Sequence, residues 1–127
     1  MKLPISITPG ELWDRISILE LKLAHASSPE REATVTAELT DLKDTWAESP
    51  YSIRISAEVM RLIRELREVN AVGWQLEDEV RRAGEEDLRL AAYARHAFHN
   101  NDRRSTIRRA LDQELGVQTT EQKEHAS

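Results

Sequence analysis

The sequence predicts an all-α fold: an antiparallel four-helix bundle in which the two long C-terminal helices form a hairpin. Apolar residues recur every three or four positions through most of the 127 residues, which is the spacing of a helix with one buried face. The chain has only four Gly and four Pro, and most of them lie where a periodic stretch begins or ends. Helices joined by short turns are expected to pack side by side around one core.

The first half of the chain is expected to hold two helices and one loop. Residues 8–11, Thr-Pro-Gly-Glu, have the pattern of an N-cap, a proline at the first helical position and a capping-box glutamate. The first helix should therefore run to about His25 or Ala26. Ser28 and Pro29 mark the start of a second helix, whose apolar face ends at Trp46. Residues 47–56 are expected to form a loop, and a strand is expected at most at residues 5–7.

Two longer helices are expected in the second half. The third should span about residues 56–83 and end at Gly84 as its C-cap, and the fourth should span about residues 87–115 and stop at Gly116. Residues 117–127 are polar and lack periodicity, which is typical of a mobile tail. We therefore expect one helical domain over residues 1–116, of a size that can bury a core without disulfide bonds.

Composition argues against several classes of protein. The 18 Lys and Arg against 23 Asp and Glu give a formal charge of −5, which argues against general nucleic-acid binding. The absence of Cys excludes disulfides, thiolate catalysis and thiolate metal sites. No stretch has the apolar length of a membrane span, and the amino terminus lacks a signal-peptide pattern. A cytoplasmic protein that does not interact with membranes is expected.

The first helix predicts a partner subunit. Its core stripe includes Leu12, Ile16 and Leu19, whereas Ile18 and Leu21 lie on nearly the opposite side. An amphipathic helix rarely leaves two such residues in water. A homodimer that covers this second face is therefore expected.

A polar line runs beside the apolar stripe of the third helix. Asn70, Trp74, Glu77 and Arg81 recur at helical spacing, and Asp78 adjoins them. Polar groups beside a buried seam cost free energy unless each finds a partner. The line therefore predicts either a ligand pocket or a structural polar network, and the sequence leaves both open.

The fourth helix interrupts its own apolar stripe at the matching level. Counting equal distances from the turn near Gly84 places Asn70 opposite Asn100 and Asn101, with Arg104 nearby. Two interruptions that align across a hairpin favour a ligand site, although buried asparagines also fix helix register. The basic run at residues 103–109 is suited to a phosphate or to ion pairs with neighbouring carboxylates.

The function that this pattern favours is that of a small accessory or binding protein with a pocket for an anionic or sugar-like ligand, such as a nucleotide sugar. In this interpretation Arg104 and Arg81 hold a phosphate or carboxylate, Glu77 and Asp78 bind hydroxyls, and Trp74 stacks on a ring. Asn70 and Asn101 complete the expected ligand-binding set. No catalytic residue is assigned, and no cofactor is required.

Two alternatives stay open. The first is an enzyme, a Mg²⁺-dependent nucleotide or nucleotide-sugar phosphohydrolase with Glu11, Asp14, Glu77 and Asp78 as metal ligands. A capping role for Glu11 competes with that assignment. The second alternative is a structural homodimer whose polar cluster only fixes the register of the helices.

Three blocks of the chain carry a resemblance to a family. The first comprises residues 9–12 (Pro-Gly-Glu-Leu) and 14–22, the second Asn70, Trp74, residues 76–78 and Arg81, and the third residues 101–104 and 115–116. Over residues 5–116 the chain resembles a family of small bacterial helical proteins with no established activity, the domain-of-unknown-function 6165 type. The tail departs from that pattern, because His125 stands near the place of the family's closing tyrosine. The resemblance implies a setting beside glycosyltransferase and surface-polysaccharide genes, and it implies no reaction.

Overall fold

The chain folds into four α-helices and one short 3-10 helix. The computed structural model describes residues 6–83 and 89–117, and 88% of these are helical, so the predicted all-α bundle is confirmed. The elements are α1 (Pro9–Ala24), α2 (Pro29–Glu48), η1 (Pro50–Arg54), α3 (Ala57–Ala83) and α4 (Arg89–Glu114). No strand occurs among the described residues, and residues 6 and 7 lead into α1 without one. The expected cap at Gly84, the first residues of the fourth helix and the tail from residue 118 lie outside the described residues.

Side-chain caps explain where three of the helices begin. The hydroxyl of Thr8 accepts a hydrogen bond from the Glu11 N–H at 3.2 Å, and that of Ser28 accepts one from the Arg31 N–H at 3.1 Å. Ser56 caps α3 in the same way, through the Val59 N–H at 3.1 Å. Each cap satisfies an N–H group that has no partner within its own helix. The predicted starts at residues 8, 28 and 56 are therefore confirmed.

The other boundaries follow from local backbone geometry. Gly116 ends α4 with a positive φ of 81°, and the Val117 N–H reaches the Asp112 carbonyl at 2.9 Å, which is the bond pattern of a Schellman cap. The prediction of a loop over residues 47–56 is wrong in part. Helix α2 continues to Glu48, and Pro50 then opens the turn of η1, in which the Ser52 hydroxyl donates to the Ser49 carbonyl at 2.9 Å.

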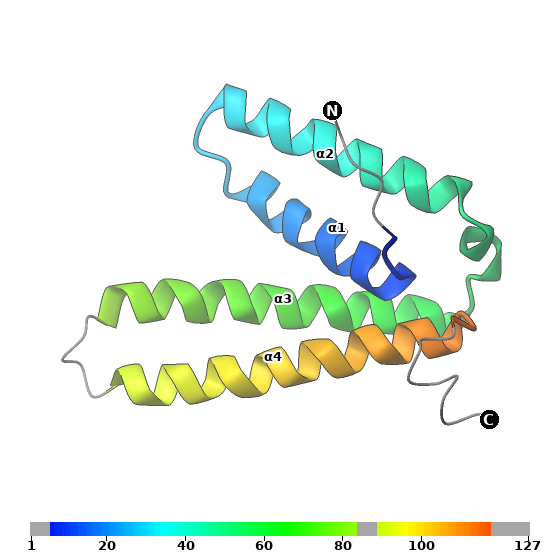
Figure 1. The fold of residues 1–127 in the computed structure, drawn as a ribbon. Helices are drawn as coiled ribbons and strands as arrows, with labels where there is room; N and C mark the ends of the chain where they lie inside the picture. The colour runs from blue at the N-terminus through cyan, green and yellow to red at the C-terminus, as the bar shows by residue number, and fades with distance from the viewer. Residues whose placement is uncertain (1–5, 84–88, 118–127) are drawn as a thin grey trace.

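The helices form two layered hairpins (Figure 1). Helices α3 and α4 pack antiparallel, α1 lies against both of them, and α2 covers the opposite side of α1 and contacts η1. The core lies where these surfaces meet and is built from 14 buried apolar residues, which are Leu12, Ile16, Leu19, Val35, Leu39, Trp46, Val59, Leu62, Ile63, Leu66, Val69, Ile107, Leu111 and Leu115. Trp13 packs against this core and contacts Trp46 edge-on, with ring centroids 5.3 Å apart.

The first turn of α1 contacts the backbone of α4 directly. The Gly10 N–H donates to the Asp112 carboxylate at 2.7 Å, so an acidic side chain of α4 meets the positive end of the α1 dipole. A Cβ atom at Gly10 would lie 2.5 Å from the Arg108 carbonyl oxygen. Glycine is therefore the residue that fits here without displacing the backbone of α4. This close contact anchors α1 over the final turns of α4.

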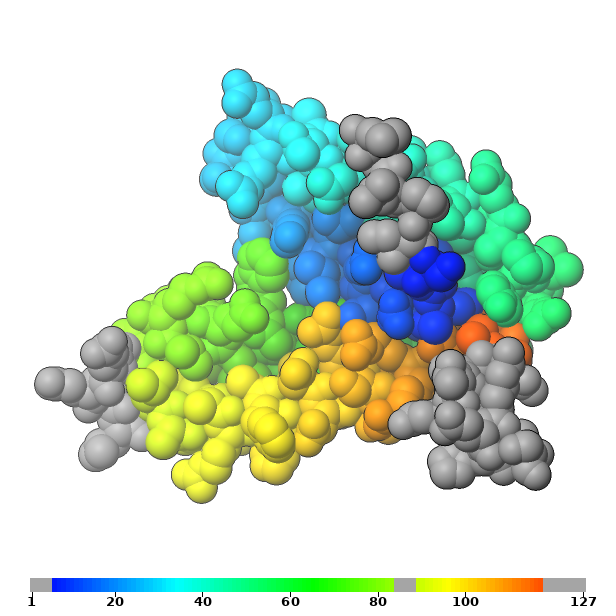
Figure 2. Space-filling view, viewed as in Figure 1, coloured from blue at the N-terminus to red at the C-terminus, as the bar shows by residue number. Residues whose placement is uncertain are grey.

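Helix α1 covers only part of the α3–α4 hairpin. Figure 2 shows the green and yellow parts of α3 and α4 extending beyond the blue surface of α1. The last buried residue of α3 is Asn70 and the first of α4 is Ile107. The apolar stripe that predicted a buried face along both helices is therefore only half-buried at Leu76, Val80, Leu90 and Tyr93, because α1 has ended at Ala24. We call residues 71–83 and 89–100 the distal half of the hairpin.

Candidate functional site

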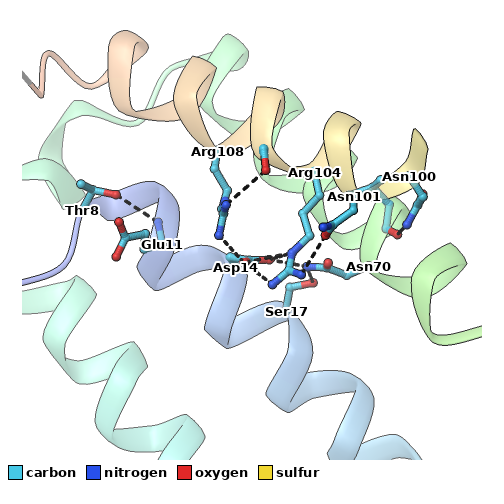
Figure 3. A network of polar contacts seen from close by, with 11 residues as sticks. Thr8, Glu11, Asp14, Ser17, Asn70, Asn100, Asn101, Arg104 and Arg108 are labelled. Atoms are coloured by element: carbon cyan, nitrogen blue, oxygen red, sulfur yellow. Dashed lines mark hydrogen bonds and ion pairs between the residues drawn. The ribbon is translucent and has the colours of Figure 1, made fainter. Parts of the chain in front are cut away.

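Asp14 is the centre of a polar network that joins three helices (Figure 3). This residue, on α1, is only 3% exposed. Its carboxylate accepts hydrogen bonds from Asn70 of α3 at 2.8 Å and from Arg104 of α4, whose Nε and Nη2 lie 2.9 and 2.6 Å away. Arg108, one turn further along α4, donates to the same carboxylate at 3.2 Å. One carboxylate thus binds two guanidinium groups and holds α1 in register with the hairpin.

The remaining polar groups of the buried part are also satisfied. The Asn70 amide donates a second hydrogen bond to the Ser17 hydroxyl at 3.2 Å, and the Asn100 amide donates to the Val69 carbonyl at 2.9 Å. Arg104 reaches outward with Nη1, which lies 3.5 Å from the Asn101 side-chain oxygen. The network is therefore closed at Asp14 and Ser17 and opens toward the surface at Arg104 and Asn101.

The surroundings of Asp14 lower its pKa. Burial alone would raise the pKa of this carboxyl, but hydrogen bonds from Arg104 and Asn70 and the charges of Arg104 and Arg108 together outweigh burial. The pKa of Arg104 moves the other way, because its hydrogen bonds to Asp14 oppose the effect of burial and the charges of Asp14 and Glu77 add to it. The influence of Glu77 shows that its carboxylate lies within electrostatic reach of Arg104.

These shifts predict how stability depends on pH. A carboxyl whose pKa is lower in the folded state contributes stability that is fully present above its ordinary value of 3.8 and is lost as pH falls through the lower folded value. Urea denaturation at a series of pH values should therefore show Asp14→Asn less stable than the wild type at neutral pH. The gap should narrow below about pH 4. A gap that is constant across the acid range would contradict the lowered pKa.

A solvent-open cleft of about 570 Å³ lies next to the network, between α1, α3 and α4. Its polar lining brings together two cations, a carboxylate, an indole and three amides: Lys22, Arg104, Glu77, Trp74, Asn70, Asn100 and Asn101. Its apolar lining comes from α1 and α4 and consists of Ile18, Leu21, Ala94, Ala97 and Phe98, and Gly73 of α3 also lines the cleft. A mostly apolar hollow with a few converging polar groups is the usual form of a small-molecule site.

Five of the seven residues predicted to bind a ligand line this cleft: Asn70, Trp74, Glu77, Asn101 and Arg104. Asp78 and Arg81 are not part of its lining. Asp78 instead pairs with Arg82 at 3.0 Å, and Arg81 lies 3.7 Å from Glu77, both within α3. They continue the helical spacing of the polar line, but Arg81 is exposed and Asp78 is half-buried outside the cleft.

Trp74 lies between α1 and the cleft. The His25 ring stacks on the indole at 4.8 Å with an interplanar angle of 25°. His25 is the C-cap residue of α1, and its Nδ1 lies 2.8 Å from the Leu21 carbonyl oxygen, which fixes the imidazole in this position. The half-buried indole is therefore held on one face by the protein.

The four carboxylates proposed as a magnesium site are not gathered. Glu11 is exposed at the start of α1, and Figure 3 shows it apart from the Asp14 network. Asp14 is bound by two arginines, and Glu77 and Asp78 face α3 arginines. No three His, Cys, Asp or Glu side chains stand close enough to hold a metal ion in the part of the chain that the structure describes.

Sequence reasoning missed the face of α1 that meets the hairpin. Asp14, Ser17, Ile18 and Leu21 follow helical spacing and together face α3 and α4, and Lys22 joins them in the cleft. Ile18 and Leu21, which predicted a partner subunit, are thus half-buried within their own chain. The sequence did hold a signal for this face. Asp14 and Ser17 recur at helical spacing with Ile18 and Leu21, which places all four on one side of the helix.

Comparisons with protein-family models, with curated proteins and with solved structures find no match to this chain. Within residues 6–83 and 89–117, none of the helices combines the length and apolar character that crossing a membrane requires.

Proposed function

We propose that the chain is a small cytoplasmic accessory protein whose cleft binds an anionic or sugar-like ligand of the nucleotide-sugar kind. One observation carries the proposal. Cationic, acidic and aromatic side chains from three helices converge on a single open hollow, through Lys22 and Arg104, Glu77, and Trp74. A set of this composition is suited to a ligand with a negative group, hydroxyls and a flat or ring-shaped part.

The charge of the site favours an anion. Asp14 compensates only one of the two arginines that contact it, so the group of Asp14, Arg104 and Arg108 keeps one positive charge. Lys22 has no ion-pair or hydrogen-bond partner among the described residues and adds a second cation to the cleft. Arg104 directs Nε and Nη2 at Asp14, and its Nη1 makes only the long contact to Asn101. A guanidinium held in place in this way binds a ligand without losing further side-chain entropy.

The acidic side of the cleft is suited to hydroxyl groups. The Glu77 side chain is 70% exposed, and its ion pair with Arg81 is long, at 3.7 Å. Its carboxylate is therefore free to accept hydrogen bonds from a sugar, while the neighbouring indole of Trp74 supplies an apolar face. The family resemblance supports a place in surface-polysaccharide metabolism.

The buried half of the network supports a second role that coexists with the first. Asp14, Ser17 and Asn70 satisfy one another, and they hold α1 in register whether or not a ligand is present. We further propose that the chain acts as a homodimer.

Ligand binding is tested by intrinsic tryptophan fluorescence during titration with UDP-glucose, with inorganic pyrophosphate and glucose as separate probes. We expect UDP-glucose to change the tryptophan fluorescence of the wild type in a saturable way. Trp74→Phe should lose this fluorescence change, because Trp13 and Trp46 lie outside the cleft. Lys22→Ala should weaken binding about tenfold, which corresponds to about 1.4 kcal/mol. Calorimetry checks each affinity.

Lys43→Ala is the matched control, because Lys43 is an exposed lysine on α2, away from the cleft. It should bind like the wild type. No saturable binding of any of the three probes, or equal affinity in Lys22→Ala and the wild type, would overturn the proposal.

A further inference from the structure

Gly73 makes room for a side chain of the neighbouring helix. It lies in the interior of α3, where glycine is less favourable for a helix than any residue except proline. A Cβ atom at Gly73 would stand 3.1 Å from the side-chain nitrogen of Asn100, so the Asn100 amide would have to move by a few tenths of an ångström. The missing side chain therefore leaves a gap in the surface of α3, which we call the Gly73 gap, and the Asn100 amide occupies it.

The Gly73 gap fixes which way the Asn100 amide points (Figure 3). The NH2 group of Asn100 donates to the Val69 carbonyl at 2.9 Å, and a carbonyl oxygen can only accept. Val69 lies one turn before Gly73, so the missing side chain leaves its carbonyl open to α4. The side-chain oxygen of Asn100 is the other end of the same planar amide, and it has no hydrogen-bond partner among the described residues.

The Asn70 amide is fixed in the same sense. Its NH2 group donates to Asp14 and Ser17, which leaves its side-chain oxygen as the end without a partner in the described residues. Within residues 6–83 and 89–117, the indole nitrogen of Trp13 is the one fully buried side-chain polar atom that has no partner. The side-chain oxygens of Asn70 and Asn100 are therefore in contact with solvent, and both residues line the cleft.

These two oxygens and the Glu77 carboxylate are hydrogen-bond acceptors that a ligand can reach. Asn70 and Glu77 lie two turns apart on one face of α3, and Asn100 lines the cleft from α4. A ligand that binds beside them must supply donors. The positive charges of Lys22 and Arg104 in the same cleft disfavour a cationic donor such as an ammonium group. Neutral hydroxyl groups, as on a sugar ring, meet both conditions.

We propose that Asn100, held in the Gly73 gap, is a specificity-determining residue that accepts hydrogen bonds from the hydroxyl groups of the ligand's sugar. This inference rests on the proposed function of the cleft and divides the ligand between its residues. Asn100 and Asn70 bind the sugar, whereas Arg104 and Lys22 bind the anionic part. Removing the Asn100 acceptor should therefore weaken the binding of a nucleotide sugar and leave the binding of the bare nucleotide unchanged.

Calorimetric titration with UDP-glucose and with UDP tests this assignment, because UDP is the same nucleotide without the sugar. Asn100→Ala should bind UDP-glucose about tenfold more weakly than the wild type and bind UDP within about twofold of it. Gln75→Ala is the matched control, because Gln75 is an exposed amide of α3 that does not line the cleft. It should bind both ligands like the wild type.

Gly73→Ala tests the gap without removing Asn100. The added methyl group displaces the Asn100 amide, so UDP-glucose should again bind more weakly, by at least about threefold, while UDP binding is retained. Alanine also favours the helix, and this gain offsets the disturbed contact with Val69. The melting temperature should therefore stay within about 4 °C of the wild type. Weaker sugar binding by a variant of unchanged stability distinguishes recognition from folding.

The possible failures of the two proposals can be told apart. An equal loss of affinity for UDP-glucose and UDP in Asn100→Ala would place Asn100 at the nucleotide and overturn the inference. Unchanged affinities together with a lower melting temperature would make Asn100 a purely structural link between α3 and α4, which also overturns it. Either result leaves the proposed function of the cleft standing. A wild type that binds neither ligand would overturn both proposals.

Discussion

Replacing Asp14 by alanine should lower the free energy of unfolding by about 3 kcal/mol, the largest effect we expect from a single polar side chain in this protein. The substitution removes the common acceptor of Asn70, Arg104 and Arg108 and leaves two like charges facing a buried gap. The two arginines are about one-third exposed, so water reaches part of each guanidinium and keeps the cost at the lower end for a broken buried pair. Urea denaturation followed by circular dichroism measures the loss.

Two further variants make this result specific. Asp14→Asn keeps the shape and one acceptor oxygen but removes the charge, and it should cost about half as much. Asp102→Ala removes an exposed carboxylate from α4 and should change stability by less than about 0.5 kcal/mol. A loss below 1 kcal/mol in Asp14→Ala would contradict the role of this carboxylate as the link between α1 and the hairpin.

The boundaries of the helices were the part of the fold most open to sequence reasoning, because capping is local. Thr8, Ser28 and Ser56 each accept a hydrogen bond from the N–H group three residues further along the chain. The capping residue and the N–H group that it satisfies therefore lie within the same short stretch of sequence. The contact of Gly10 with α4 is different. Its partner, Asp112, is 102 residues away, and no residue near Gly10 in the sequence indicates that α1 packs against α4 at this point.

The polar site was predictable only where the hairpin sets the register. Asn70 and Arg104 were expected near each other because they lie at matching levels of two helices joined by one turn, and both bind Asp14. The position of α1 across that hairpin has no such rule. Asp14 therefore counted only as a possible metal ligand, although it is the carboxylate that brings the site together.

Amphipathic spacing also does not show where a covering helix stops. The stripe of α3 continues unchanged from Leu66 through Leu76 to Val80, but burial ends at Asn70 because α1 ends at Ala24. The same limit applies to Asp78 and Arg81, which share the spacing of the cleft residues and yet pair along α3. A periodic pattern gives the face of a helix, and tertiary packing decides which length of that face becomes a site.

Arg104→Ala and Glu77→Ala should separate stability from binding, although both residues line the cleft. Arg104→Ala leaves Asp14 buried with only Arg108 and Asn70 as partners, and it should lower the free energy of unfolding by about 2–3 kcal/mol. Glu77 is exposed and has one long ion pair, so Glu77→Ala should cost about 0.5 kcal/mol or less.

Both substitutions should nevertheless weaken binding of UDP-glucose, since one removes the guanidinium edge that faces the anion and the other removes the acceptor for hydroxyls. Urea denaturation and calorimetry on the same two variants measure the two effects independently. If Glu77→Ala destabilised the fold as much as Arg104→Ala, Glu77 would belong to the closed network around Asp14. If instead both variants bound the ligand normally, the polar residues of the cleft would serve only to fix the helices. The combination that we expect, a stable Glu77→Ala and a destabilised Arg104→Ala that both bind poorly, requires Arg104 to belong to the buried network and to the ligand site at once.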